Sequence, residues 1–171
     1  MKKVLLISHA RSGKDTVANM LESMIGLKNT SSSRYALFEV PEIQEELVFN
    51  YYGANEPNPD LEAIYFGRRE RRAFWYNTIS NYNSNDPTRL AREIFRDYDI
   101  YNGLRDDNEF RYAKAYQLYD ICIWVDASQR VPPEDISSMK LNKGMADIIL
   151  DNNGTELELV TKVKQLSRLL L

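Results

Sequence analysis

The sequence predicts an α/β fold, a three-layer α/β/α arrangement with a mainly parallel central sheet. Three observations favour it. Short apolar segments alternate with helical patterns along the chain. A glycine-containing loop follows the first apolar segment and leads directly into a helix. The chain has 171 residues, of which 43% are hydrophobic, enough to fill one core. We therefore expect a single domain over residues 1–171.

The first 26 residues predict a strand, a loop and a helix. Residues 3–8 are a short apolar run rich in branched side chains, which is typical of a buried strand. A loop over 9–13 follows. Lys14–Ile25 then carries apolar residues at helical spacing, up to a typical helix stop at Gly26. This order is the usual opening of a parallel α/β sheet.

The middle of the chain predicts helices joined by polar loops. Residues 29–33 are polar and predict a loop. Pro41–Tyr52 predicts a helix, because proline is favoured in the first helical turn. Residues 53–60, with several Asn and Pro, predict another loop. One long helix is expected over 61–80, and a shorter one over 88–96.

The last third of the chain alternates strands and helices again. The expected elements are, in order, a strand over 97–104, a helix over 109–119, a strand over 121–125, a polar loop with at most one helix over 127–143, a strand over 147–150 and a final helix after 155. Thr155 and Glu158 match the capping-box pattern at the start of that last helix.

Composition excludes several classes of function. The net charge is −3, from 22 basic and 25 acidic residues, which argues against wrapping around duplex nucleic acid. No apolar run approaches the roughly 20 residues that span a bilayer, and the one at the start is too short for a signal peptide. The lone cysteine, Cys122, favours a reducing compartment. We expect a complete cytoplasmic protein, with its oligomeric state open, a homodimer included.

Residues 8–16, S-H-A-R-S-G-K-D-T, carry the most informative motif. They match the phosphate-binding pattern G-x-x-x-x-G-K-[ST] at Gly13 and Lys14. Such a loop points backbone N–H groups at phosphates from a helix N-terminus, and its lysine adds a positive charge. Ser8 replaces the first glycine, and Asp15 replaces the usual hydroxyl residue. His9, the only histidine, is read as a loop residue rather than a base.

This motif predicts ATP as a ligand and Mg²⁺ as its companion ion. The residues expected to contact the phosphates are Ala10, Arg11, Ser12, Gly13, Lys14, Asp15 and Thr16. A carboxylate is a natural ligand for magnesium, so Asp15 is the expected metal ligand.

The R-S-G-K-D-T form of this loop resembles that of phage-type deoxynucleoside monophosphate kinases and, more loosely, dephospho-coenzyme-A kinases. Residues 146–157, A-D-I-I-L-D-N-N-G-T-E-L, are similar to the run before the last helix of those kinases. Residues 103–109, G-L-R-D-D-N-E, are similar to their D-x-R-x-x-x-E segment. The resemblance implies a P-loop kinase fold with an acceptor-binding helical region at about 34–85 and a short lid at about 127–143.

One departure from the family pattern bears on the chemistry. The family begins the D-x-R segment with aspartate, at a position that often helps the magnesium or the acceptor phosphate. This chain has Gly103 there. Compensation is then left to another carboxylate, and the candidates are Asp15, Asp99, Asp106 and Asp107.

The resemblance implies a (deoxy)nucleoside monophosphate kinase that uses Mg-ATP. Such an enzyme must bind two anions, and arginine suits this because its planar fork binds phosphate bidentately. The residues expected to bind the acceptor are Arg34, Arg71, Arg72 and Arg105. The residues expected to act in catalysis are Lys14, Arg105 and Arg130, the last from the lid. Nearby aromatics, such as Trp75 and Tyr76, are more often core than base-stacking.

Two other functions stay open at this point. A kinase related to dephospho-coenzyme-A kinases would phosphorylate a hydroxyl group, and would need a catalytic carboxylate near the loop, which Asp15 could supply. A regulatory protein that binds a nucleotide with little turnover would tolerate Gly103, but it would not need so many arginines beyond the loop.

Overall fold

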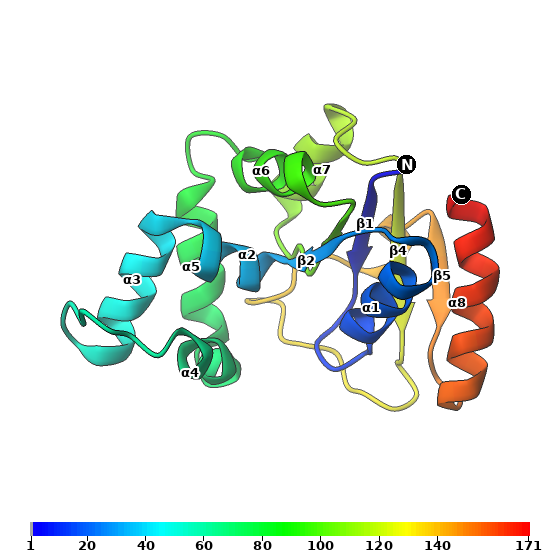
Figure 1. Ribbon diagram of the computed structural model, residues 1–171, viewed down its shortest axis with the longest axis horizontal. Coiled ribbons are helices and arrows are strands. Elements are labelled where there is room, and N and C mark those ends of the chain that lie inside the picture. The colour runs from blue at the N-terminus through cyan, green and yellow to red at the C-terminus, as the bar shows by residue number, and fades with distance from the viewer. Residues whose placement is uncertain (1) are drawn as a thin grey trace.

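Five parallel strands form the centre of the computed structural model, which describes residues 2–171 (Figure 1). The strands are β1 (Val4–Ile7), β2 (Asn29–Ser31), β3 (Ile100–Asn102), β4 (Ile121–Asp126) and β5 (Ile148–Asp151). Their order across the sheet is β2-β3-β1-β4-β5, and every neighbouring pair is parallel. The order reverses direction at β1, the point where open α/β sheets bind their ligands.

Helices cover both faces of this sheet, which confirms the predicted three-layer fold. The α-helices are α1 (Lys14–Ile25), α2 (Ser32–Glu39), α3 (Pro41–Tyr52), α4 (Leu61–Phe66), α5 (Arg72–Tyr82), α6 (Arg89–Asp97), α7 (Asp107–Ala115) and α8 (Glu156–Leu170). Two short 3₁₀ helices are η1 (Gly67–Arg71) and η2 (Lys143–Met145). None of the helices in the described part of the chain is long and apolar enough to cross a membrane.

Alternating side chains of β1 explain the layers. Val4 and Leu6 are fully buried in the cluster that includes the apolar faces of α1 and α8, which pack side by side (Figure 1). Leu5 and Ile7 are fully buried in the cluster on the opposite face, with residues of α6 and α7. The strand is therefore apolar throughout, as expected for a parallel strand buried on both faces.

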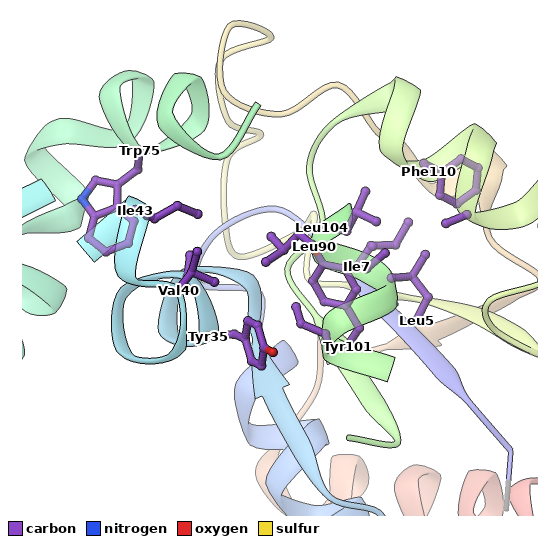
Figure 2. Packing of buried hydrophobic residues seen from close by; sticks show 14 of the residues in the cluster. Leu5, Ile7, Tyr35, Val40, Ile43, Trp75, Leu90, Tyr101, Leu104 and Phe110 are labelled. Atoms are coloured by element: carbon purple, nitrogen blue, oxygen red, sulfur yellow. The ribbon is translucent and has the colours of Figure 1, made fainter. Parts of the chain in front are cut away.

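The second cluster continues beyond the sheet into helices α2 to α5. Figure 2 shows Trp75 of α5 beside Ile43 of α3, and Tyr101 of β3 next to Ile7 of β1. This continuity joins the helical region that begins after β2 to the edge of the sheet. It fixes α5 and η1, which carry several arginines, opposite the loop that follows β1.

Two sequence predictions are wrong in this helical region. Residues 29–33 are not a loop, because Asn29–Ser31 pairs with β3 and the Ser31 hydroxyl then accepts a hydrogen bond from Arg34 N at 3.1 Å to begin α2. Residues 61–80 are not one helix, because the chain tightens into η1 and departs from helical geometry at Arg71, where φ is −129°.

The other predicted boundaries differ by a few residues. The strand expected over 97–104 is limited to the three residues that pair with β1 and β2. The helix expected over 109–119 begins at Asp107, because Asp106 caps it, and ends before Gln117, whose φ is +54°. The capping box of Thr155 and Glu158 is confirmed at the start of α8.

Candidate functional site

The loop between β1 and α1 adopts the left-handed backbone conformation at two positions. Arg11 and Gly13 both have positive φ, +62° and +91°. A Cβ atom at Gly13 would collide with the side-chain amide of Asn152, which donates to Ser12 O at 2.9 Å. Ser8 is buried and is not among the positive-φ residues of the described chain, so its position does not require the glycine of the standard pattern.

The side chain of Lys14, the first residue of α1, is only 13% exposed and lies among polar groups. Its Nζ is 3.5 Å from the Asp15 carboxylate, and Asn102 Nδ2 donates to the same carboxylate at 3.0 Å. Burial lowers the pKa of the Lys14 ammonium, Arg105 and Arg68 lower it further, and Asp15 opposes them. The lysine is thus surrounded by an excess of positive charge, which a bound anion would neutralise.

Gly103 lies directly against this lysine. Its φ is +91°, and a Cβ atom there would come within 3.3 Å of Lys14 Cε and 3.4 Å of Ser32 Oγ. An aspartate at this position would be strained and would crowd the lysine. The structure thereby gives a physical reason why a glycine rather than an aspartate stands at position 103.

Of the four carboxylates expected to replace the missing aspartate, Asp15 is the one beside the loop. Asp99 pairs with Lys3 before β3 begins, at the other end of the strand. Asp107 pairs with Arg111 in an exposed turn of α7, and Asp106 caps that helix. Only Asp15 also lines the cavity beside the phosphate loop.

The residues around Asp15 fit a magnesium ion that keeps most of its water. Its side chain is 56% exposed, and the buried Oδ1 of neighbouring Asn102 has no hydrogen-bond partner. The described residues contain no group of three or more His, Cys, Asp or Glu side chains arranged for a metal. Magnesium at phosphate sites is typically bound by one or two carboxylates plus substrate phosphates, so a single carboxylate is compatible with it.

A cation-rich cavity of about 570 Å³ opens in front of the phosphate loop. Its lining includes Arg11, Lys14, Arg68, Arg69, Arg72 and Arg105, against one carboxylate, that of Asp15. The protein as a whole has a net charge of −3, so this concentration of positive charge is local. Such a surface favours an anionic ligand.

A second cavity of about 560 Å³ continues from the first. The two share lining residues, namely Ser32, Ser33, Arg68, Arg72, Gly103 and Arg105. Beyond them the second cavity is walled by aromatic and apolar side chains, among them Trp75, Tyr76, Ile79 and Leu104. Its other polar residues include Tyr101, Asp106 and Glu109. We call it the aromatic cavity below.

Glu134 connects the phosphate loop to the arginines. Its carboxylate accepts hydrogen bonds from Ala10 N, Arg72 Nη1 and Arg105 Nη1, each at 2.6 Å. Burial raises the pKa of this carboxyl, but Arg105, the Ala10 amide and Arg72 outweigh burial, so the pKa lies below its usual value. The backbone N–H of Glu134 also donates to His9 Nδ1 at 3.1 Å. An internal carboxylate is thus bound between the loop and the two arginines.

The structure brings only some of the predicted arginines to the cavities. Arg72 and Arg105 line both of them. Arg34 instead pairs with Glu62 at 3.0 Å and lies over the Phe38 ring. Arg71 donates a hydrogen bond to Asn50 and lines neither cavity. In their place the structure adds Arg68 and Arg69, which belong to η1.

The remaining predicted residues lie around the loop. Arg130 donates from Nε to Asn152 O at 2.8 Å, and Asn152 in turn bonds Ser12, so Arg130 is linked to the loop on the side of β5. Thr16 is exposed in the first turn of α1. His9 packs edge-on against Trp124, and Cys122 is buried in the core.

Several lining residues were not predicted from the sequence. Ser32 and Ser33 fall in the segment taken as a loop. Glu134, which lines neither cavity but bonds two arginines that do, was missed as well, because those partners are at least 29 positions away. The arginines at 68 and 69 stand beside the predicted Arg71 and Arg72 in the sequence, so the basic cluster itself was a usable signal for them. No local pattern pointed to Glu134.

Comparison with known proteins bears on the fold alone. No protein-family model matches the chain, and no curated sequence is significantly similar to it. Among solved structures, the chain is similar to a shikimate kinase from Bacteroides thetaiotaomicron, with TM-score 0.53 and 8% identity over 99% of this chain and 98% of that one. It is also similar to a sugar kinase from Janibacter sp. HTCC2649, with TM-score 0.50 and 12% identity over 96% and 93%. The chain therefore shares its fold, a five-stranded parallel sheet with flanking helices, with these two proteins.

Proposed function

We propose that this protein is an ATP-dependent kinase that transfers the γ-phosphoryl group to a (deoxy)nucleoside monophosphate. The observation that carries the proposal is the continuity of the two cavities. A phosphate loop, a cluster of arginines and an aromatic cavity follow one another along one surface. A nucleoside triphosphate at the loop would place its phosphates, and a monophosphate its own phosphate, against the cations. The base of the monophosphate would then enter the aromatic cavity.

The proposed roles follow from the position of each group. Lys14 and the N–H groups of the loop would bind the β- and γ-phosphates of ATP. Arg68, Arg72 and Arg105 would bind the acceptor phosphate and neutralise charge as the phosphoryl group moves. Magnesium beside Asp15 would supply further neutralisation of the phosphate oxygens.

The arginines also bear on what the acceptor is. A hydroxyl acceptor requires a carboxylate that is free to remove its proton, whereas an acceptor phosphate brings an anionic nucleophile of its own. Glu134 is occupied by two arginines and an amide, and its lowered pKa makes it a weak base. Five arginines line the cation-rich cavity, more than a neutral hydroxyl acceptor needs.

A hydroxyl-directed small-molecule kinase is the second candidate, and one observation favours it. The half-exposed Asp15 lines the cation-rich cavity beside Lys14, where a general base would act. If Asp15 binds magnesium it is not available as that base, so the two candidates give this residue different roles.

The test measures ADP release from Mg-ATP with each ribo- and deoxynucleoside monophosphate offered separately, beside tubes with no acceptor and with the free nucleosides. We expect stimulation by one or a few monophosphates and none by nucleosides. Lys14→Met should abolish this stimulation, because it removes the positive charge that would neutralise the transferred phosphoryl group. Lys28→Met, outside the site, should retain the stimulation. Stimulation by nucleosides alone, release independent of acceptor, or ATP binding without release would each contradict the proposal.

A further inference from the structure

One glutamate in the aromatic cavity is unlike every other charged residue of the described chain. Glu109 lines that cavity and is only 2% exposed, and no other acidic or basic residue over 2–171 is classed as buried. Burying a carboxyl group is costly unless it has partners. Its one hydrogen bond to a side chain comes from Tyr101 OH, which donates to Oε1 at 2.8 Å.

The position of Glu109 in its helix makes this burial more informative. It is the third residue of α7, where a glutamate usually turns back to bond the capping residue, as Glu158 does at the same position in α8. In α7 the cap is made by Asp106 alone, which accepts from Glu109 N at 2.9 Å. The Glu109 side chain is diverted to Tyr101 at the wall of the cavity. Helix capping therefore does not explain it.

The chemistry of the pair indicates what it offers a ligand. Burial raises the pKa of Glu109 to about 8, Tyr101 opposes this shift, and the nearby Asp106 charge adds to it. The carboxyl group is then protonated at neutral pH. Because Oε1 accepts from Tyr101, the proton belongs on Oε2, which is left to donate into the cavity.

The surroundings select the kind of ligand. Trp75 and Tyr76 give the cavity ring-sized apolar walls, and Arg72 and Arg105 lie where it joins the cation-rich cavity. Tyr76 OH already donates to Asp106 at 2.6 Å, so this hydroxyl is not free to donate to a ligand, whereas the hydrogen bond from Tyr101 uses only Oε1 of Glu109. A planar ring attached to a phosphate would place its edge at Glu109.

We propose that Glu109, oriented by Tyr101, is a specificity-determining residue that donates a hydrogen bond to a carbonyl oxygen or ring nitrogen of the acceptor's base. This inference rests on the proposed function, since it assigns the base-reading group of that same acceptor. It predicts that the enzyme rejects monophosphates whose base has no hydrogen-bond acceptor atom at the edge that meets Glu109.

The test compares Glu109→Leu with Glu109→Gln. Glutamine keeps an oxygen for Tyr101 and an amide N–H for the base, whereas leucine keeps neither. We expect the leucine variant to raise the KM for the preferred monophosphate about tenfold, the range of one buried hydrogen bond, with the KM for ATP unchanged. The glutamine variant should stay within about threefold of the parent. Glu158→Gln, a change at the same position of a remote helix, is the control and should alter neither constant.

A second variant serves as the control for misfolding. Tyr101→Phe combined with Glu109→Leu removes both polar partners together, so it leaves no buried hydroxyl unpaired and should fold. It should show the same rise in KM. An unchanged acceptor KM in both leucine variants, or a glutamine variant as weak as leucine, would overturn the role of Glu109 while leaving the kinase intact. A parent protein that uses no monophosphate at all would overturn both proposals.

Discussion

At the scale of single residues, Arg105 carries the sharpest expectation. It lines both cavities, and its guanidinium donates to Glu134 at 2.6 Å and to Ser138 O at 3.3 Å. These contacts fix its fork at the junction between the phosphate loop and the aromatic cavity. An arginine oriented in this way can bind an acceptor phosphate without first losing much side-chain freedom.

We expect Arg105→Ala to raise the KM for the acceptor monophosphate about 10- to 100-fold, as for the loss of one charge-assisted hydrogen bond or two. The KM for ATP should change far less. Arg111→Ala is the matched control, because Arg111 is exposed on α7, pairs only with Asp107 and lines neither cavity. Steady-state kinetics with both substrates varied would decide it. Equal effects on the KM of the two substrates would mean that Arg105 contacts both nucleotides or neither of them.

Residues also show how far the sequence could predict the site. Gly13 and Lys14 could be proposed from the sequence because the phosphate-loop motif is a local pattern, set by a strand, a turn and a helix that follow one another. Glu134 could not be, because its partners Ala10, Arg72 and Arg105 come from three distant segments. A contact of that kind is decided by tertiary packing, which leaves no spacing to detect.

At the scale of elements, the same distinction separates the right predictions from the wrong ones. The bounds of α1 and α3 match the expectation, since a proline start or a glycine stop marks them. The strand β2 was missed because its three residues are polar and show no strand pattern in the sequence. They form a strand through pairing with β3. The break at η1 was missed because Gly67, which ends α4, was not read as a helix stop.

The end of strand β3 offers a test at this scale. Gly103→Ala puts a methyl group at positive φ, within 3.3 Å of Lys14 Cε, whereas Gly26→Ala puts one at positive φ in open space after α1. Both variants should lose about 1 kcal/mol of unfolding free energy from backbone strain. Only Gly103→Ala should also lose most of its phosphoryl transfer, because the lysine is displaced. Chemical denaturation and ADP release would separate the two effects, and equal activity losses would show that Gly103 has no special relation to Lys14.

At the scale of the whole molecule, the distribution of charge is the distinctive feature. The chain is acidic overall, yet six cations converge on one cavity, where burial and mutual repulsion lower the pKa values of Lys14 and Arg72. Such a cluster weakens the folded state until an anion neutralises it. Binding of a polyanion should therefore be visible as stabilisation of the entire fold, since a ligand of the native state raises its stability by mass action.

We expect tripolyphosphate at about 100 times its Kd to add about 2.7 kcal/mol of stability, which is a rise in Tm of about 5–10 °C for a chain of this size. The rise should shrink in about 0.5 M salt, because part of the attraction is screened. Lys14→Met should lose at least half of it, since its charge lies at the centre of the cluster. Thermal unfolding monitored by circular dichroism, with and without the anion, measures all three. An equal rise in Lys14→Met would mean that the anion binds elsewhere on the surface, and the charge cluster would then have no part in recognising phosphate.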